Sequence, residues 1–188
     1  MHARLLKAVR TLPGITIRDL YETYPDFDVF PKVEQPILEQ HDLIILQHPF
    51  YWYSGPALLK QWMDLVLEHG WAYGKDGTAL QGKYVMQVIS TGGTAHAYSA
   101  EGHHGHAGYD FLLPFRQTAA LCHMEYLPPY VVPGSAHIEE ADLARYADSY
   151  VQLLQGLASK TTDLKALQQM PEANMLLNMP GLLSAPSR

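Results

Sequence analysis

The chain has 188 residues, a length that fits a single domain, and 47% of them are hydrophobic, which is enough for a sizeable core. Its formal net charge of −6 and its lack of a Lys- or Arg-rich helix argue against nucleic acid as the main partner. The single cysteine, Cys122, rules out an internal disulfide and indicates a small core residue rather than a nucleophile. No apolar run approaches the ~18 residues of a membrane span and no signal peptide opens the chain, so we expect a cytoplasmic protein.

The spacing of the apolar residues predicts strands that alternate with helices. In chain order we expect a helix at 2–12, a strand at 15–20, a short helix at 33–41, a strand at 43–47, a helix at 56–68, a strand at 84–90, a helix at 110–122, a strand at 125–132 broken by Pro128-Pro129, and a helix at 139–157. This order predicts an α/β fold with a parallel sheet and right-handed crossovers. We expect residues 1–158 to form this domain. Residues 159–188 have no clear period, and we expect a tail that packs on a neighbour or lacks fixed structure.

The strand expected at 43–47 ends in a proline and four consecutive aromatic residues. The loop is Pro49-Phe50-Tyr51-Trp52-Tyr53, and the crossover helix begins near Pro56. In open α/β sheets, ligands bind at the carboxyl ends of the strands. Loop aromatics often belong only to the core, but consecutive rings cannot all face one interior. The sequence therefore favours a binding site for a flat aromatic ligand.

The next strand, at 84–90, ends in Thr91-Gly92-Gly93. Paired glycines allow backbone N–H groups to approach a ligand closely, and such donors suit a carbonyl edge or a developing negative charge. The alternative is a flexible turn. The aromatic loop on the preceding strand favours the ligand-binding interpretation.

A loop rich in histidine follows, with Tyr98 among His96, His103, His104 and His106. The carboxylates nearby are only those of Glu101 and Asp110, and zinc sites usually combine His with Cys or carboxylates at regular short spacing, so we expect no metal. A His and a Tyr beside a redox ligand can instead exchange or share protons. His96 and His106 are more typical of an exposed, mobile loop.

Several motifs together resemble the two-electron NAD(P)H:quinone reductase family, which has the flavodoxin-like fold and includes DT-diaphorase. Within this family the resemblance is strongest to the Kef glutathione-regulated potassium-efflux ancillary oxidoreductases. The shared segments are His48-Pro49, Trp52-Tyr53-Ser54, 56–62, 69–74 and Thr91-Gly92-Gly93 with Tyr98 and His104. The resemblance extends from about residue 5 to residue 155.

The resemblance implies a three-layer sandwich and assigns roles to individual residues. It implies that Pro49, Phe50, Tyr51, Trp52 and Tyr53 line a flavin, and that Thr91, Gly92 and Gly93 hold its ring edge by backbone hydrogen bonds. Tyr98 and His104 match the family's catalytic pair, six residues apart. In the family this pair stabilises charge on the flavin when hydride arrives.

The same resemblance implies FMN or FAD, with FMN favoured, and NAD(P)H as co-substrate. It implies ping-pong reduction of a quinone or a similar acceptor by a homodimer. It also implies an alternative: a regulatory subunit that binds the cytosolic part of a potassium efflux transporter, and through it the inner membrane, with or without catalysis.

Two features depart from the family pattern. Many members have Gln at the position of Tyr51. The chain also lacks the family's usual first strand and phosphate loop, because Met1-His2-Ala3 already lies in the predicted first helix. We therefore expect an N-terminally incomplete flavin domain, with a gap of roughly 9–10 Å in the sheet and weakened flavin binding.

Overall fold

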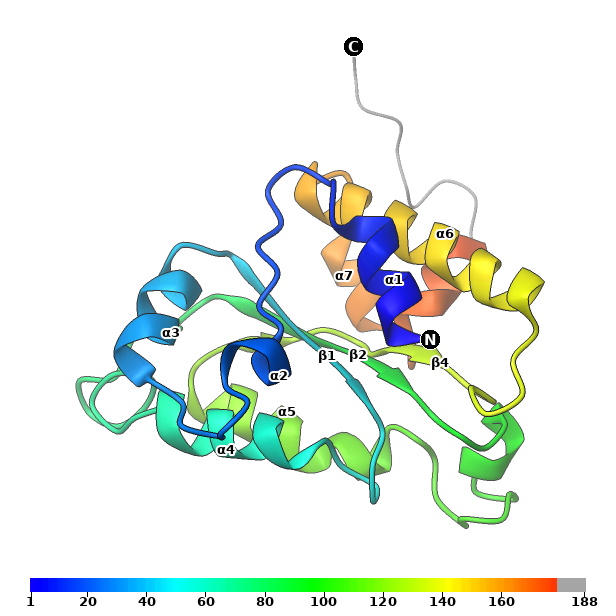
Figure 1. Cartoon of the computed structure of the whole chain (residues 1–188), viewed down its shortest axis with the longest axis horizontal. Coiled ribbons are helices and arrows are strands. Elements are labelled where there is room, and N and C mark those ends of the chain that lie inside the picture. The colour runs from blue at the N-terminus through cyan, green and yellow to red at the C-terminus, as the bar shows by residue number, and fades with distance from the viewer. Residues whose placement is uncertain (179–188) are drawn as a thin grey trace.

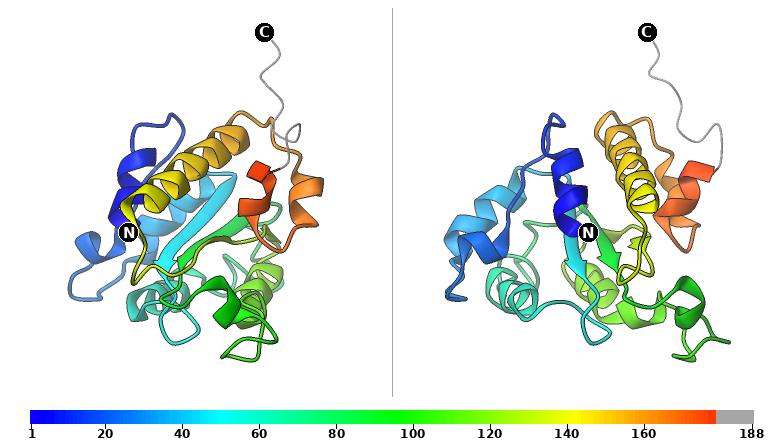
Figure 2. Two further views of the ribbon diagram at one scale, coloured as in Figure 1. Left: turned by 90° about the vertical axis from the view of Figure 1, so that its right-hand side faces the viewer. Right: turned by 45° about the vertical axis from the view of Figure 1, so that its right-hand side comes forward.

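The computed structural model describes residues 1–178 and shows a parallel sheet between two layers of helices (Figure 1). The strands are β1 (Leu43–Pro49), β2 (Tyr84–Ser90), β3 (Glu125–Tyr126) and β4 (Tyr130–Val132). The helices are α1 (His2–Val9), α2 (Leu20–Thr23), α3 (Pro31–Glu39), α4 (Ala57–Val66), α5 (Leu113–Leu121), α6 (Glu140–Ala158) and α7 (Leu164–Gln168), with 3-10 turns η1 (Ala95–Tyr98), η2 (Asp110–Leu112) and η3 (Ala173–Asn178). Helices α1, α6 and α7 cover one face of the sheet, and α4 and α5 cover the other (Figures 1 and 2).

Strand β2 lies at the centre of the sheet, and all its partners run parallel to it. Strand β1 pairs with β2 along its whole length, from Leu43 opposite Tyr84 to Pro49 opposite Ser90. Strand β3 pairs with the first half of β2 and β4 with the second half. Pro128-Pro129, which carry no backbone N–H, lie between them and interrupt the ladder. The register places the carboxyl ends of β1 and β2 side by side.

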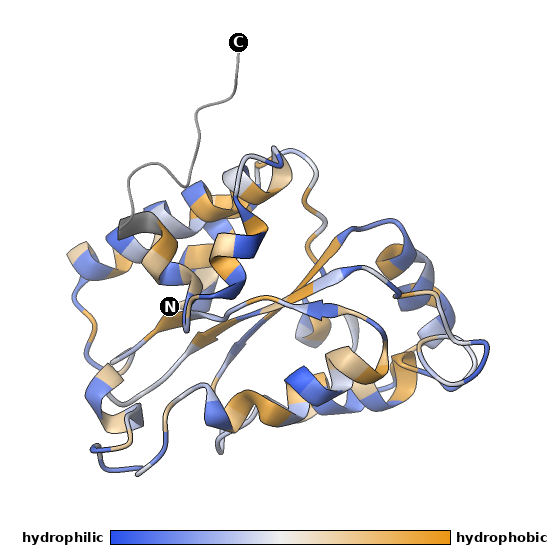
Figure 3. Cartoon of the chain, turned by 180° about the vertical axis from the view of Figure 1, so that it is seen from behind, coloured by the Kyte–Doolittle hydropathy of each residue, from blue (hydrophilic) through white to orange (hydrophobic). Residues whose placement is uncertain are grey.

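Two hydrophobic cores hold the layers together. One packs α1, α6, α7 and η3 against Met86 and Val88 of β2, and the other packs α3, α4 and α5 against Ile44, Leu46 and Ile89. Alternate residues of each strand point to opposite faces, which is why neighbouring residues of β2 enter different cores. The helices carry both hydrophobic and hydrophilic residues, as expected where one side packs on a sheet (Figure 3).

The strand predicted at 15–20 is wrong. Residues 15–19 are extended but belong to no sheet, and α2 begins at Leu20, capped by the side chain of Asp19. Within residues 1–178, β1 pairs only with β2, so no strand lies beside residues 15–19. An alternating sequence forms a ladder only where a neighbouring strand offers backbone partners, and residues 1–178 place no strand there.

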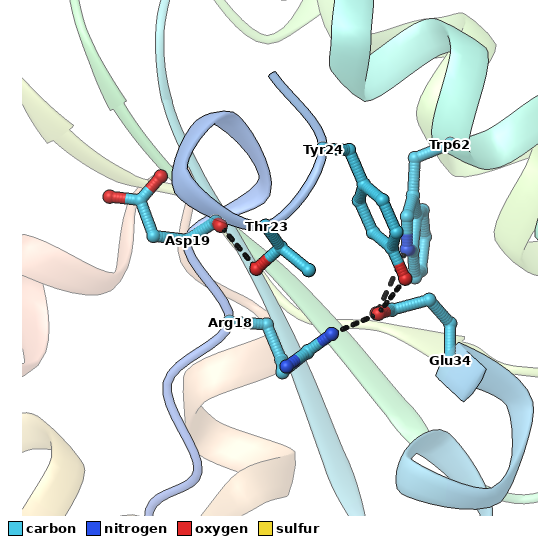
Figure 4. A network of polar contacts seen from close by, with 6 residues as sticks. All are labelled: Arg18, Asp19, Thr23, Tyr24, Glu34 and Trp62. Carbon is cyan, nitrogen blue, oxygen red and sulfur yellow. Dashed lines mark hydrogen bonds and ion pairs between the residues drawn. The ribbon is translucent and has the colours of Figure 1, made fainter. Parts of the chain in front are cut away.

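Side chains anchor this segment instead (Figure 4). The carboxylate of Glu34 is almost fully buried and accepts hydrogen bonds from Arg18 (2.5 Å), Tyr24 (2.7 Å) and Trp62 (3.2 Å). Burial alone would raise the pKa of Glu34, but these three donors outweigh it and lower the pKa. His41 also bonds the hydroxyl of Thr16 at 2.8 Å. The network ties residues 15–24 to α3 and α4.

The segment after α6 differs from the prediction of a tail that packs on a neighbour or lacks fixed structure. Leu167, Ala173 and Leu176 are fully buried in the core of the same chain. The side chain of Asn174 bonds both the N–H and the carbonyl of Val131, at 2.7 and 2.9 Å, and so satisfies the outer edge of β4. The remainder of the predicted tail, 179–188, lies outside the described residues.

Candidate functional site at the ends of β1 and β2

The two loops singled out from the sequence leave the sheet together. The N–H of Phe50 donates to the carbonyl of Ser90 at 2.8 Å, extending the ladder one residue past β1. The ring of Phe50 then packs edge-on against Tyr98, with centroids 5.7 Å apart. The aromatic loop (49–53) and the loop Thr91-Gly92-Gly93, called the Gly-rich loop from here on, therefore form one site at the carboxyl edge of the sheet, where ligands of open α/β folds bind.

The aromatic loop turns sharply and exposes its rings. Trp52 and Tyr53 have positive φ values of 51° and 59°, and the Ser54 N–H donates to the carbonyl of Tyr51 at 3.0 Å. Positive φ at both central residues is typical of a type I′ turn, which usually contains Asn or Gly. Each bulky residue there costs roughly 1–2 kcal/mol. Trp52 is 92% exposed, whereas Phe50 is buried at the base of the loop.

The Gly-rich loop presents free backbone donors. Thr91 is buried, its hydroxyl donates to the carbonyl of Gly93, and that carbonyl also accepts from Gly134. The N–H groups of Gly92 and Gly93 have no partner among the described residues. A Cβ on Gly93 would lie 3.3 Å from the ring of Tyr98, so a larger residue would crowd that ring, while Gly92 is open. Both donors can therefore meet the edge of a ligand closely.

Tyr98 and His104 converge with Tyr53. The rings of Tyr98 and His104 lie 4.4 Å apart, and the Tyr53 hydroxyl is 3.3 Å from His104 Nδ1. Burial, followed by the neighbouring Tyr53, raises the pKa of Tyr98, so its hydroxyl stays protonated and can donate. When Tyr53 donates to Nδ1, the neutral His104 carries its proton on Nε2. The cluster thus offers two donors beside the free glycine N–H groups.

Two residues near this edge were missed by the sequence analysis. Phe111, at the start of the helix after the His-rich loop, stacks on Tyr53 with centroids 5.0 Å apart and also contacts Phe50 and Tyr98. His2, at the start of α1, bonds the hydroxyl of Ser90 at 2.9 Å. Neither belongs to the motifs quoted above: Phe111 follows the His-rich loop, and His2 reaches the site from the start of α1.

Of the other histidines in the loop, His103 packs against His104 and His106 against Phe111. In residues 1–178, no three His, Cys, Asp or Glu side chains converge as a group that could hold a metal ion. No helix of that part of the chain is long and apolar enough to cross a membrane.

The parallel sheet between two helical layers agrees with a family model described as "Flavodoxin-like fold", which matches residues 1–154. The chain belongs to this flavodoxin-like family. Over 151 residues it is 44% identical to the glutathione-regulated potassium-efflux system ancillary protein KefG of Yersinia enterocolitica, covering 80% of this chain and 82% of that protein.

Solved structures give the same fold with differing activities. General stress protein 14 of Treponema denticola, in complex with FMN, is 38% identical with a TM-score of 0.78, covering 83% of this chain and 90% of that one. An NADPH-quinone reductase from P. pentosaceus is 34% identical with a TM-score of 0.73, covering 80% and 86%. A protein named as a thermophilic tryptophan halogenase is 43% identical with a TM-score of 0.77, covering 79% and 86%. Similarity at this level fixes the fold but not the reaction.

Proposed function

We propose that this protein is an FMN-dependent NAD(P)H dehydrogenase that reduces quinones by two-electron transfer. The observation that carries the proposal is the convergence of an exposed aromatic loop, two free glycine N–H groups and the Tyr98–His104 pair at one edge of the sheet. Similarity to an FMN complex and to an NADPH-quinone reductase supports it.

These residues suit an isoalloxazine ring. Its flat face would pack on the rings of the loop 49–53, and its polar edge would accept hydrogen bonds from the N–H groups of Gly92 and Gly93. Thr91 would hold the Gly-rich loop in place through its bond to Gly93. When bound, the flavin supplies the hydride chemistry of both half-reactions.

The protein's own contribution is orientation and electrostatics. Tyr98 and His104 are the proposed catalytic residues, because their donors would face the edge of the bound ring on which negative charge develops on reduction. NAD(P)H would stack beside Trp52, deliver its hydride and leave, and a quinone would then use the same surface. The order is ping-pong because a single exposed aromatic surface serves both reactants.

The experiment starts with the purified 188-residue protein. Titration of the deflavinated protein with FMN and FAD, followed by flavin fluorescence, tests cofactor binding and its selectivity. Initial rates with NADH or NADPH and a soluble naphthoquinone should give parallel double-reciprocal lines. Failure to bind either flavin, or rates no faster than free FMN, would overturn the proposal.

A second candidate function is regulation of a potassium efflux transporter, with or without catalysis. The observation that favours it is the 44% identity to KefG over most of both chains. The partner would be the cytosolic part of such a transporter, which would hold this protein at the inner face of the membrane. Co-purification with that soluble domain, at unchanged strength when Tyr98 and His104 are replaced, would separate regulation from catalysis.

A further inference from the structure

A buried imidazole lies directly behind the aromatic loop and has no role in the site described above. His48, the penultimate residue of β1, is 3% exposed. Its ring stacks on Phe115, with centroids 5.8 Å apart and planes inclined at 25°. On another side it lies against Gly55, where a Cβ would come within 3.3 Å of the imidazole. The ring is therefore fixed in position.

A chain of hydrogen bonds across the sheet sets which nitrogen of His48 carries the proton. The Tyr126 hydroxyl on β3 donates to Gln87 Oε1 at 2.6 Å, and Gln87 Nε2 lies 3.1 Å from His48 Nε2. An amide nitrogen can only donate, so His48 Nε2 must accept and be unprotonated. The proton of the neutral ring is then on Nδ1. Burial lowers the pKa of His48, which agrees with a neutral ring.

That proton points to the base of the strained turn. His48 Nδ1 lies 3.0 Å from the carbonyl of Pro49, which also accepts from the N–H of Tyr51 at 3.0 Å. Directly after these two bonds come Trp52 and Tyr53 with their left-handed backbone. Such conformations persist only where the surrounding structure holds them, and they concentrate at functional sites.

We propose that His48 is a positioning residue. Gln87 and Tyr126 keep the proton of its ring on Nδ1. This Nδ1–H fixes the Pro49 carbonyl and so holds the Tyr51–Ser54 turn that presents Trp52 to the ligand. The inference rests on the proposed function only in taking that ligand to be FMN. An apolar residue at position 48 would fill the space but could not supply the donor.

Two substitutions of similar size separate the donor from mere packing. The amide nitrogen in His48→Asn reaches the place of Nδ1, whereas His48→Gln reaches the place of Nε2 and leaves the Pro49 carbonyl without this partner. We expect hydrogen exchange of the Ser54 amide to be roughly tenfold faster in His48→Gln, with FMN affinity weakened roughly tenfold, and both to stay near wild type in His48→Asn. Equal behaviour of the two variants would overturn the proposal.

Two further measurements keep the test decisive if both variants fail to fold. Imidazole ¹⁵N shifts of the wild type should report the Nδ1–H form of His48, and finding Nε2–H would overturn the proposal. Tyr126→Phe removes only the hydroxyl that orients Gln87, so it should raise the Nε2–H population and speed Ser54 exchange, although Tyr126 lies two strands away from β1. An unchanged tautomer and unchanged exchange in this variant would also count against it.

The exchange and ¹⁵N measurements need no cofactor. If the wild type does not bind FMN but Ser54 protection still follows the donor at position 48, the positioning role stands and the proposed function fails. If FMN binds and protection of the Ser54 amide does not depend on the residue at position 48, the positioning role is overturned and the proposed function is not.

Discussion

Burial and backbone conformation determine what single residues at this site can do. Tyr98 keeps its proton because burial raises its pKa, and the N–H groups of Gly92 and Gly93 donate to no carbonyl of residues 1–178. Trp52 is exposed because a left-handed turn directs the chain away from the sheet. The site is thus rich in donors, which suits a ligand that becomes negative during the reaction.

Tyr98→Phe and His104→Ala should each slow reduction of bound FMN by NAD(P)H roughly tenfold or more and leave FMN affinity largely unchanged. The reason is that a donor to charge that exists only on reduction acts on the transition state. Stopped-flow absorbance measures the reduction, and fluorescence titration measures affinity. The matched control is His96→Ala, in the same loop. Wild-type rates in both test variants would remove the pair from the mechanism.

His2 predicts a pH dependence of stability. Burial, with smaller effects of His48 and the N-terminal ammonium, lowers the pKa of His2 from 6.5 to about 4. Between these values the unfolded chain binds a proton at His2 and the folded chain does not, so the free energy of unfolding falls as the pH drops through this window. The lowered pKa of His48 acts in the same direction.

We therefore expect the melting temperature to fall between about pH 7 and about pH 4, and to fall less in His2→Asn. The exposed His137 offers the control, since His137→Asn should keep the wild-type slope. Thermal unfolding at a series of pH values compares the slopes. If His2→Asn keeps the full slope, the lowered pKa of His2 is not its source.

Among the elements, the segment 15–24 (extended residues 15–19 followed by α2) shows how side chains can replace the backbone hydrogen bonds of a sheet. Its contact with α3 and α4 runs through the buried Glu34 carboxylate and its three donors (Figure 4). Removing Arg18 leaves that charge buried with two neutral donors, which is costly.

Arg18→Gln should lower the free energy of unfolding by about 3 kcal/mol, as measured by urea denaturation. Tyr24→Phe, which removes a single hydrogen bond, should cost about 1 kcal/mol. The control is Lys60→Gln on α4, which breaks the exposed ion pair with Asp64 and should cost less than about 1 kcal/mol. Similar losses for Arg18→Gln and Lys60→Gln would mean that the buried network does not hold the segment.

Most elements could be predicted from the sequence because their apolar pattern matches their burial: the continuous apolar run of β2 is buried on both faces, and the helical period of α6 is buried on one. Residues 15–20 alternate as a strand would, yet the pattern cannot say whether a partner strand is present. Residues 164–178 pack through a few buried side chains with no period to detect. At the site, both loops follow their strands directly and were predicted. Phe111 and the Tyr126–Gln87–His48 chain are brought together only by the fold.

For the molecule as a whole, the sheet has an open edge at β1. Within residues 1–178, β1 pairs on one side only, and the family resemblance implies a strand and a phosphate loop there. We propose that a version of the protein extended by the first strand and phosphate loop of a flavodoxin-like relative binds FMN at least about tenfold more tightly, since phosphate contacts are charge-assisted. Titration of both deflavinated proteins with FMN tests this. Equal affinities would show that the added segment is dispensable.

The exposed aromatic rings lead to the last prediction, a homodimer. Trp71 and Tyr73, in the segment 69–74 shared with the resembled family, are half-buried in this chain, and Trp71 donates to Glu39. Tyr51, Trp52 and Tyr53 are exposed at the edge of the site. A cluster of exposed rings usually marks an interaction site, and a second copy would close the site from the side that the chain leaves open.

Light scattering should therefore give a mass of about 42 kDa, twice the 21.1 kDa of one chain, at micromolar concentration. Trp52→Ser should shift the equilibrium toward the monomer, because the ring that projects furthest loses its apolar area. Tyr21→Ser, at an exposed ring of α2, should leave the mass unchanged. A mass of one chain for the wild type would show that the aromatic loop faces solvent or ligand alone, and equal shifts in both variants would place the interface elsewhere.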